Sequence, residues 1–217
     1  MNPYKLLSVL LSYPSAELQQ ALQTEISFVS DQTHAWQSKL KELIDYLTQT
    51  DLITIQENFV TTFDRNSKHS LHLFEHLHGE HRDRGDAMVN LLHEYQAQGF
   101  EPTGYELPDY LPLFLEFLSL QDENQAADLL SEAVHVIQYI ADKLHEHSSI
   151  YASVLDLAVS LSPITPVPLK VTPIRDMDEA LEIFGPNPKG VEPLLNSQIN
   201  DVQIIKISPS QKRTGAI

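Results

Sequence analysis

Residues 123–146 carry the sequence ENQAADLLSEAVHVIQYIADKLHE, and this stretch decides the fold. Its apolar residues return every three or four positions, as in Ala126, Leu129, Leu130, Ala133, Ile137, Ile140, Ala141 and Leu144. Because an α-helix turns once in about 3.6 residues, this spacing predicts a long helix with one apolar face toward a core. Asp122, followed three positions later by Gln125, approximates a capping box and marks where that helix begins.

The rest of the N-terminal part repeats this pattern. A second one-sided stripe runs through Trp36, Leu40, Leu43, Ile44 and Leu47. No proline occurs at 15–101 or at 113–162, so helices are permitted there. No run of alternating apolar and polar residues, the pattern of a half-buried strand, interrupts the series. We therefore expect an all-α protein with helices near 3–12, 16–28, 32–48, 51–64, 69–77, 83–98, 108–120, 123–146 and 149–161.

Proline and charge both divide the chain near Ser162. Of the 13 prolines, 5 lie before this position and 8 lie after it. Residues 1–162 hold 8 basic and 24 acidic residues, a net charge of −16, whereas 163–217 hold 6 of each. We therefore expect a single helical bundle at 1–162 and a Pro-rich, largely irregular tail at 163–217. The tail begins PITPVP, which predicts extended or polyproline-like backbone, and one short helix is expected at 176–184.

Composition excludes several classes of function. With 42% hydrophobic and 20% charged residues, the chain is typical of a folded globular protein. It has no cysteine, which excludes disulfides and thiolate catalysis and is typical of a reducing cytoplasm. The apolar run at 6–11 is far shorter than the about 20 residues that span a bilayer, so we expect no stable membrane insertion. The charge of −16 disfavours nucleic acid and favours a basic partner, unless the acidic surface serves only solubility.

The histidines raise the question of a metal site. All 10 precede Ser148, and His72, Glu75 and His76 match the H-x-x-E-H pattern of inverted zinc peptidases. A zinc metallohydrolase is therefore the alternative hypothesis, although no cysteine and no third ligand at a suitable spacing supplements the pair. The other interpretation is that these histidines cap the end of a helix beside Gly79 and lie on its surface. Phosphate-binding glycine loops and a nucleophile elbow are absent from the sequence, so we expect neither an enzyme nor a bound cofactor.

Two stretches stand out as candidate partner sites. The first, 74–88 (FEHLHGEHRDRGDAM), concentrates positive charge among carboxylates. Arg82 and Arg84 could pair with Asp83, Asp86 or a distant acid and so fix the turn between two helices. Alternatively, this stretch grips a partner, and the candidate residues are then His76, Arg82, Asp83 and Arg84.

The second stretch, 105–118 (YELPDYLPLFLEFL), places Pro108 and Asp109 at an expected helix start. The helix that follows is apolar nearly all round, which is typical of a central core helix. Its surplus of aromatic and leucine side chains could also line a groove that receives an amphipathic helix. Glu106 and Asp109 would then lie at the rim of this groove.

Together, in this order, the two stretches resemble the nitrate reductase molybdenum cofactor assembly chaperones of the NarJ type, within the TorD-like redox enzyme maturation proteins. The resemblance extends to about Leu161, and its segments are YKLLS at 4–8, LSYP at 11–14, FD at 63–64, 74–88 and 106–118. Relatives carry an E-x-P-D-H type motif near the guest site. Glu106, Pro108 and Asp109 match this motif, while Tyr110 stands in place of its histidine.

The resemblance implies an all-helical, cofactor-free chaperone that binds the apo catalytic subunit of a respiratory nitrate reductase, chiefly through that subunit's N-terminal segment. It would hold the subunit competent for molybdenum cofactor insertion, delay membrane attachment and then leave. Molybdenum cofactor delivery proteins are conceivable further partners. A constitutive structural subunit of the reductase is the rival interpretation within the same system.

A mechanistic hypothesis follows from the acidic body and the apolar helix. We expect the apolar face of a basic guest helix to pack on Leu111, Phe114, Leu115 and Leu118. Glu106 and Asp109, beside Tyr110, would meet the guest's basic residues.

Overall fold

The longest helix of the part of the chain that the structure describes is α8, Glu123–Glu146. The structure, a computed structural model, describes residues 2–29, 35–78 and 82–169, with the side chains of 25–29, 35–37, 78, 82 and 83 outside that description. Helix α8 begins where expected, because the Asp122 carboxylate accepts a hydrogen bond from the backbone N–H of Gln125 at 2.9 Å. Every member of its predicted apolar stripe is buried.

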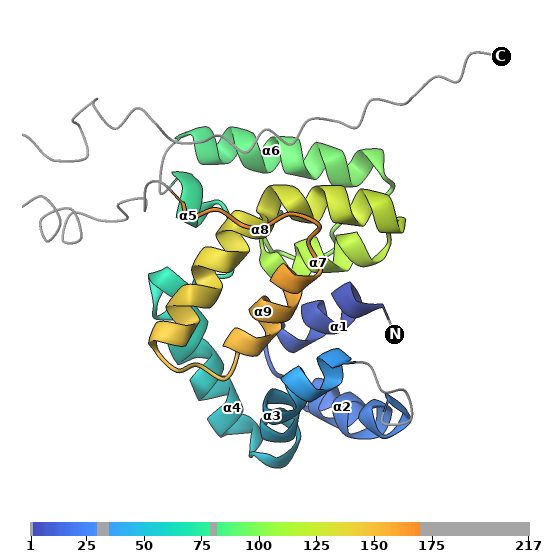
Figure 1. Cartoon of the computed structure of the whole chain (residues 1–217), viewed down its shortest axis with the longest axis vertical. Helices are drawn as coiled ribbons and strands as arrows, with labels where there is room; N and C mark the ends of the chain where they lie inside the picture. Colours follow the sequence, from blue (N-terminus) through green and yellow to red (C-terminus); the bar gives the residue numbers. More distant parts are fainter. Residues whose placement is uncertain (1, 30–34, 79–81, 170–217) are drawn as a thin grey trace, which may run out of the picture.

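Helices α7 (Leu111–Ser119) and α9 (Ala152–Ser160) pack against α8, and α1 (Pro3–Leu10) packs on α7 and α9. Helix α9 folds back on α8 after a turn in which Ser148 adopts a positive φ of 51°. Helix α1 lies on α7, and the Asn2 side chain joins them by capping Tyr4 and donating to the Ser119 carbonyl. Figure 1 shows α9 and α1 near the middle of the bundle, next to α8 and α7.

The remaining helices cover the two ends of this core. Figure 1 shows α6 at one end of the molecule and α2, α3 and α4 at the other. Two short turns, η1 and η2, connect α4 to the segment before α5, and η1 is π-helical. The elements concerned are α2 (Ala16–Val29), α3 (Ala35–Gln49), α4 (Leu52–Phe59), η1 (Val60–Asp64), η2 (Ser67–His69), α5 (Glu75–His78) and α6 (Arg82–Ala97).

The predicted all-α fold is confirmed for the described residues, but the helix expected at 69–77 is wrong. In the first half of this range, His72 forms an antiparallel bridge with Tyr110. The backbone N–H of Leu73 donates to the Asp109 carbonyl at 3.0 Å, and that of Leu111 donates to the Leu71 carbonyl at 2.8 Å. Because these groups pair across the chain, only residues 75–78 form a helix here, and α7 begins at Leu111 rather than at 108.

The start of the tail is extended, as its prolines predict. Residues 163–169 contain no helix, and the backbone N–H of Val167 donates to His135 Nδ1 on α8 at 2.9 Å. Leu169 packs against the core. Residues 170–217 lie outside the described residues, and so does the short helix expected at 176–184.

Across the described ranges, no helix combines the length and the apolar character that crossing a membrane requires.

Candidate functional site

Asp109 is a fully buried carboxylate at the point where the 71–74 segment meets the start of α7. Such a group is costly to bury unless it is paired. Its Oδ2 accepts a hydrogen bond from the backbone N–H of Phe74 at 3.1 Å, and its Oδ1 lies 3.3 Å from His72 Nδ1. The Arg84 guanidinium lies 3.7 Å from Oδ2. Asp109 therefore ties together α6, α7 and the segment before α5.

Arg84 connects this carboxylate to a second one. Its Nη2 lies 3.3 Å from Glu75 Oε1, and the Arg84 side chain is only 18% exposed. The predicted pairing of Arg84 with a distant acid is thereby confirmed, with Glu75 and Asp109 as partners. The Arg84 charge thus holds α6 against α5 and the start of α7.

His72 is the fourth ionisable group of this network, after Asp109, Arg84 and Glu75. Burial lowers the pKa of its imidazole, but the hydrogen bond and charge of Asp109, together with Glu75, outweigh that effect, so the pKa is raised overall. The ring also packs beside Tyr110, with centroids 5.3 Å apart. His72 therefore fixes the position of Tyr110.

Tyr110 stands at the wall of a surface cavity of about 290 Å³, which we call the Tyr110 pocket. Its lining combines aromatic, aliphatic and acidic side chains from η1, η2 and the segments flanking the bridge: Phe59, Phe63, Asp64, Ser67, Ser70, Leu71, His72, Glu75 and Tyr110. The aromatic part is rigid, because the Phe63 ring packs on Phe59 at 4.9 Å and on Tyr151 at 5.0 Å between centroids. A preformed, partly apolar hollow suits binding of a side chain or short segment.

Two carboxylates, Asp64 and Glu75, line the Tyr110 pocket, and Glu106 lies near Tyr110. Burial raises the pKa of the Tyr110 hydroxyl, and the nearby charges of Glu106 and Asp64 raise it further. Both of these acids are exposed to solvent. The apolar lining residues Phe59, Phe63 and Leu71 are each at most 4% exposed, so the exposed acids are what an occupant meets, and they favour one with basic side chains.

The structure corrects the expected groove in two ways. Asp109 does not lie at a rim, because three partners satisfy its charge inside the protein: Phe74 and His72 from the segment before α5, and Arg84 from α6. The side chains expected to contact a guest are buried in the core, at 3% exposure or less, because α7 is covered by α1 and α8. These residues are Leu111, Phe114, Leu115 and Leu118.

The other residues expected to bind a partner lie in different surroundings. Tyr110 lines the pocket, and Glu106 lies near Tyr110 without being a lining residue. The Pro108 carbonyl accepts a hydrogen bond from the Tyr95 hydroxyl at 2.8 Å. His76 is fully buried, with its Nε2 2.8 Å from the Ser70 carbonyl. The side chains of Arg82 and Asp83 lie outside those that the structure describes.

The zinc hypothesis fails on geometry. Its motif requires His72 and His76 one turn apart on one helix, but α5 begins only at Glu75, and His72 lies in the bridge to Tyr110. The His72 ring faces Asp109, whereas His76 is bound to the Ser70 carbonyl. Among the described residues, no group of three potential ligands could hold a metal ion.

Phe63 and Asp64 were not selected as site residues from the sequence, although they contribute to the Tyr110 pocket. The available signal was their place in the FD segment of the family resemblance. Their approach to Tyr110 depends on the π-helical turn η1, which sequence periodicity does not predict.

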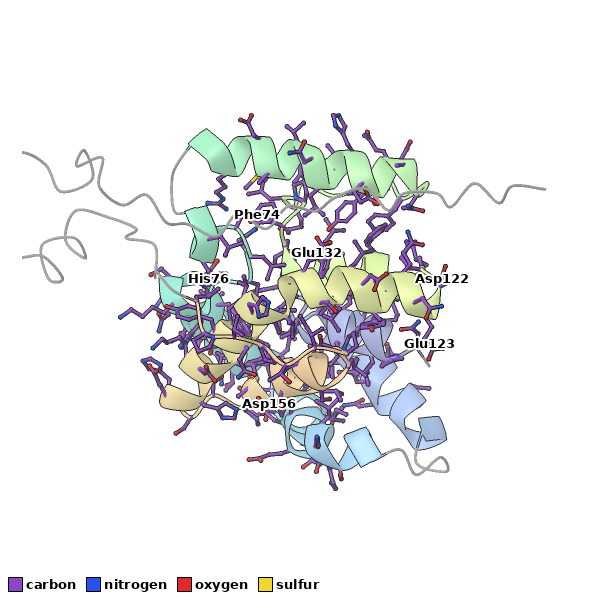
Figure 2. The ribbon with its side chains drawn as sticks, turned by 45° about the horizontal axis from the view of Figure 1, so that its top comes forward. Phe74, His76, Asp122, Glu123, Glu132 and Asp156 are labelled. Carbon is purple, nitrogen blue, oxygen red and sulfur yellow. The ribbon has the colours of Figure 1, made fainter. Side chains whose placement is uncertain are left out.

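A second, smaller cavity lies between α6, α7 and α8. It is almost entirely apolar, with Phe74, Leu91 and Phe114 in its lining, but the Glu132 carboxyl also faces it. Figure 2 shows Glu132 in the space between α8 and α6. Burial raises the pKa of Glu132 to about 7, with the charges of Glu94 and Asp128 adding to the effect, and its Oε2 has no hydrogen-bond partner.

Comparison with known proteins identifies the family. A sequence model described as nitrate reductase delta subunit matches residues 30–155. The chain is 35% identical over 164 residues to the nitrate reductase molybdenum cofactor assembly chaperone NarJ of Escherichia coli (strain K12), covering 72% of this chain and 68% of that protein.

Two further relatives agree. One is the probable nitrate reductase molybdenum cofactor assembly chaperone NarW of Escherichia coli (strain K12), 32% identical over 75% of this chain and 68% of its own. The other is the probable chaperone NarJ of Bacillus subtilis (strain 168), 30% identical over 72% of this chain and 86% of its own. The chain therefore belongs to the nitrate reductase delta subunit family, together with these NarJ-type assembly chaperones.

Proposed function

We propose that this protein is a cytoplasmic chaperone that binds the apo catalytic subunit of a respiratory nitrate reductase, chiefly through that subunit's N-terminal segment. It keeps the subunit competent for insertion of the molybdenum cofactor, delays its attachment to the membrane and then leaves. It is not an enzyme, in agreement with a family whose similar members are named as assembly chaperones. Proteins that deliver the cofactor are further candidate partners.

The observation that carries this proposal is the Tyr110 pocket in a chain of this family. Its lining includes the exposed carboxylate of Asp64, and Glu106 is exposed near Tyr110, so both acids offer negative charge to a basic segment. Phe59 and Phe63 are buried and offer little apolar area. A basic segment of the unfinished enzyme would be attracted by these charges, which supply orientation and a faster rate of association.

The buried residues support the pocket instead of forming it. Leu111, Phe114, Leu115 and Leu118 fix α7 in the core, and Asp109 fixes the backbone on both sides of the bridge. We propose that they act on the client indirectly, by holding Tyr110 and Glu106 in place. Arg84 has the same role from α6.

A calorimetric titration tests the site. The probe is a synthetic peptide with the sequence of the N-terminal segment of the nitrate reductase catalytic subunit from the same organism. Asp64→Lys and Glu106→Lys should each weaken binding at least about tenfold, since each replaces an attraction at the pocket with a repulsion. Glu42→Lys makes the same charge change on the exposed surface of α3 and should bind as the unchanged protein does. Equal affinity in all three variants would reject the Tyr110 pocket as the client site.

A pull-down tests the function itself. The tagged chain, expressed in cells blocked in molybdenum cofactor synthesis, should retain the nitrate reductase catalytic subunit. In cells that complete the cofactor, it should retain much less. Persistent association with mature, cofactor-loaded reductase would instead support a constitutive subunit, and absence of the catalytic subunit from both samples would refute the proposal.

A further inference from the structure

A further surface cavity, of about 380 Å³, lies along α4 and η1, and we call it the Tyr13 pocket. Its lining follows one face of this helical stretch and is completed by Tyr13 and Arg65; the other members are Ile53, Gln56, Glu57, Val60 and Thr61. Two of its apolar side chains are open to solvent, since Ile53 is 68% exposed and Tyr13 is 51% exposed. The Tyr13 pocket therefore offers the apolar contact area that the Tyr110 pocket lacks.

The Tyr13 side chain is held in place on α4. Its ring packs edge-on against Phe59, with centroids 5.6 Å apart. The Gln56 side-chain amide donates to the Pro14 carbonyl at 2.8 Å, which ties the next residue of the chain to the same helix. Because these contacts fix the wall, Tyr13 stays exposed instead of folding onto the core. Exposed apolar side chains that share one fixed hollow are typical of a surface that binds a partner.

The Tyr13 pocket and the Tyr110 pocket are neighbours. Phe59, against which Tyr13 packs, also lines the Tyr110 pocket. Asp64 lines the Tyr110 pocket, and the next residue, Arg65, lines the Tyr13 pocket. Figure 1 shows α4, which carries Ile53, at the edge of the molecule. From Ile53 to Asp64 a helix rises about 17 Å, so one bound helix of about 12 residues is long enough to reach both pockets.

The charges of this combined surface indicate the kind of partner that it fits. Glu57 lines the Tyr13 pocket and Asp64 lines the Tyr110 pocket, and both are exposed. Neither forms an ion pair with another residue that the structure describes, and the same holds for Arg65. The net charge of −16 at 1–162 attracts a basic partner, and Arg65 adds a place for one acidic side chain. The surface therefore fits an amphipathic helix that carries basic side chains and one acid beside an apolar face.

We propose that the Tyr13 pocket binds the apolar face of the client segment whose basic side chains meet Glu57 and Asp64. The proposal rests on the proposed function, because its occupant is the N-terminal segment of the apo catalytic subunit. The segment binds as an amphipathic helix, with apolar side chains on Tyr13 and Ile53 and an acidic side chain near Arg65. Burial at the Tyr13 pocket supplies affinity, and the acids supply orientation and rate.

The peptide titration tests this proposal with one further set of variants. Ile53→Gln keeps a side chain of similar size but removes the apolar contact, so it should weaken binding about tenfold. Leu120→Gln is the matched control, because Leu120 is 65% exposed at the end of α7, and it should bind as the unchanged protein does. Ile53→Leu should preserve binding. The heat capacity change of binding should become less negative in Ile53→Gln, since less apolar surface is buried.

Paramagnetic relaxation locates the segment on the protein. The chain has no cysteine, so a spin label can be attached at a single introduced one. A label at Thr54→Cys, exposed beside Ile53, should broaden the NMR signals of the apolar residues of an isotope-labelled client peptide. A label at His93→Cys, exposed on α6 at the other end of the molecule, should leave them unchanged. Equal broadening from both positions, or none from Thr54→Cys although the peptide binds, would overturn the proposal.

The outcomes separate this proposal from the proposed function. If Asp64→Lys weakens binding and Ile53→Gln does not, the Tyr13 pocket is rejected and the client site at the Tyr110 pocket stands. If Ile53→Gln weakens binding and Asp64→Lys does not, the Tyr13 pocket is supported and the Tyr110 pocket is rejected. No binding of the peptide to the unchanged protein refutes both. If sedimentation shows a dimer that Ile53→Gln dissociates, a second copy of the chain covers the Tyr13 pocket, and the proposal is wrong.

Discussion

Replacement of Asp109 should destabilise the protein in two separable steps. Asp109→Asn keeps an oxygen that can accept the Phe74 N–H but removes the charge that faces Arg84 and His72. Breaking a buried ion pair by removing one partner costs about 3–5 kcal/mol. The cost here falls just below this range, at about 2–3 kcal/mol, because Arg84 keeps Glu75 as a partner and is partly exposed. Asp109→Ala also leaves the Phe74 N–H without an acceptor in a buried site, which adds about 1–3 kcal/mol.

The assay is equilibrium unfolding in urea at pH 7.5, followed by circular dichroism at 222 nm. We expect the midpoint to fall in the order unchanged protein, Asp109→Asn, Asp109→Ala, with similar slopes. Glu106→Gln is the matched control, because it neutralises an exposed carboxylate three residues away, and it should leave the midpoint unchanged. A loss below about 1 kcal/mol for Asp109→Asn would refute the claim that this charge is satisfied mainly by its buried partners.

Three further predictions concern single groups. Glu132→Gln should raise the free energy of unfolding at pH 8 by about 1 kcal/mol, a value reduced for the partial exposure of Glu132, and should have no effect below pH 4.5. The folded pKa of Glu132 is about 7, above the usual 4.5, so its carboxylate destabilises the fold increasingly as pH rises between these values. Urea unfolding at several pH values measures the difference. His72→Gln should destabilise the protein mainly below pH 6.5. There the protonated His72 stabilises the fold, because its folded pKa is raised, and this contribution is lost as pH rises through the folded pKa. Thermal unfolding at pH 6 and pH 8.5 measures the difference. Asp122→Ala should cost about 1 kcal/mol by removing the cap of α8, and amide hydrogen exchange should show faster exchange at Gln125, whose N–H the carboxylate accepts at 2.9 Å.

The helices were predictable because their signals are local. The stripe from Ala126 to Leu144 and the cap at Asp122 lie within one continuous segment, so periodicity and capping chemistry suffice to place α8. The same holds for α1, where Asn2 caps the helix and Pro3 begins it. Neither feature requires knowledge of a distant part of the chain.

The 69–77 region and the site around it were not predictable in this way. Locally, residues 72–76 have helical spacing, but their backbone pairs with residues near 109, more than 30 positions away, and this tertiary pairing overrides local preference. Asp109 was expected at the rim of a groove, to meet a basic residue of the guest, and carboxylates are seldom buried. Its burial becomes favourable only when Phe74, His72 and Arg84 converge on it.

This convergence links the stability of the fold to the shape of the candidate site. Tyr110 follows Asp109 directly, and the backbone on either side of it is paired, by the Asp109 carbonyl to Leu73 and by the Leu111 N–H to Leu71. The pocket wall therefore cannot shift without breaking the same contacts that bury the carboxylate. Asp64, in the pocket lining, and Glu106, near Tyr110, have no such structural role, since both are exposed. Rim acids are thus free to select a partner by charge, while the buried acid preserves the geometry into which that partner fits.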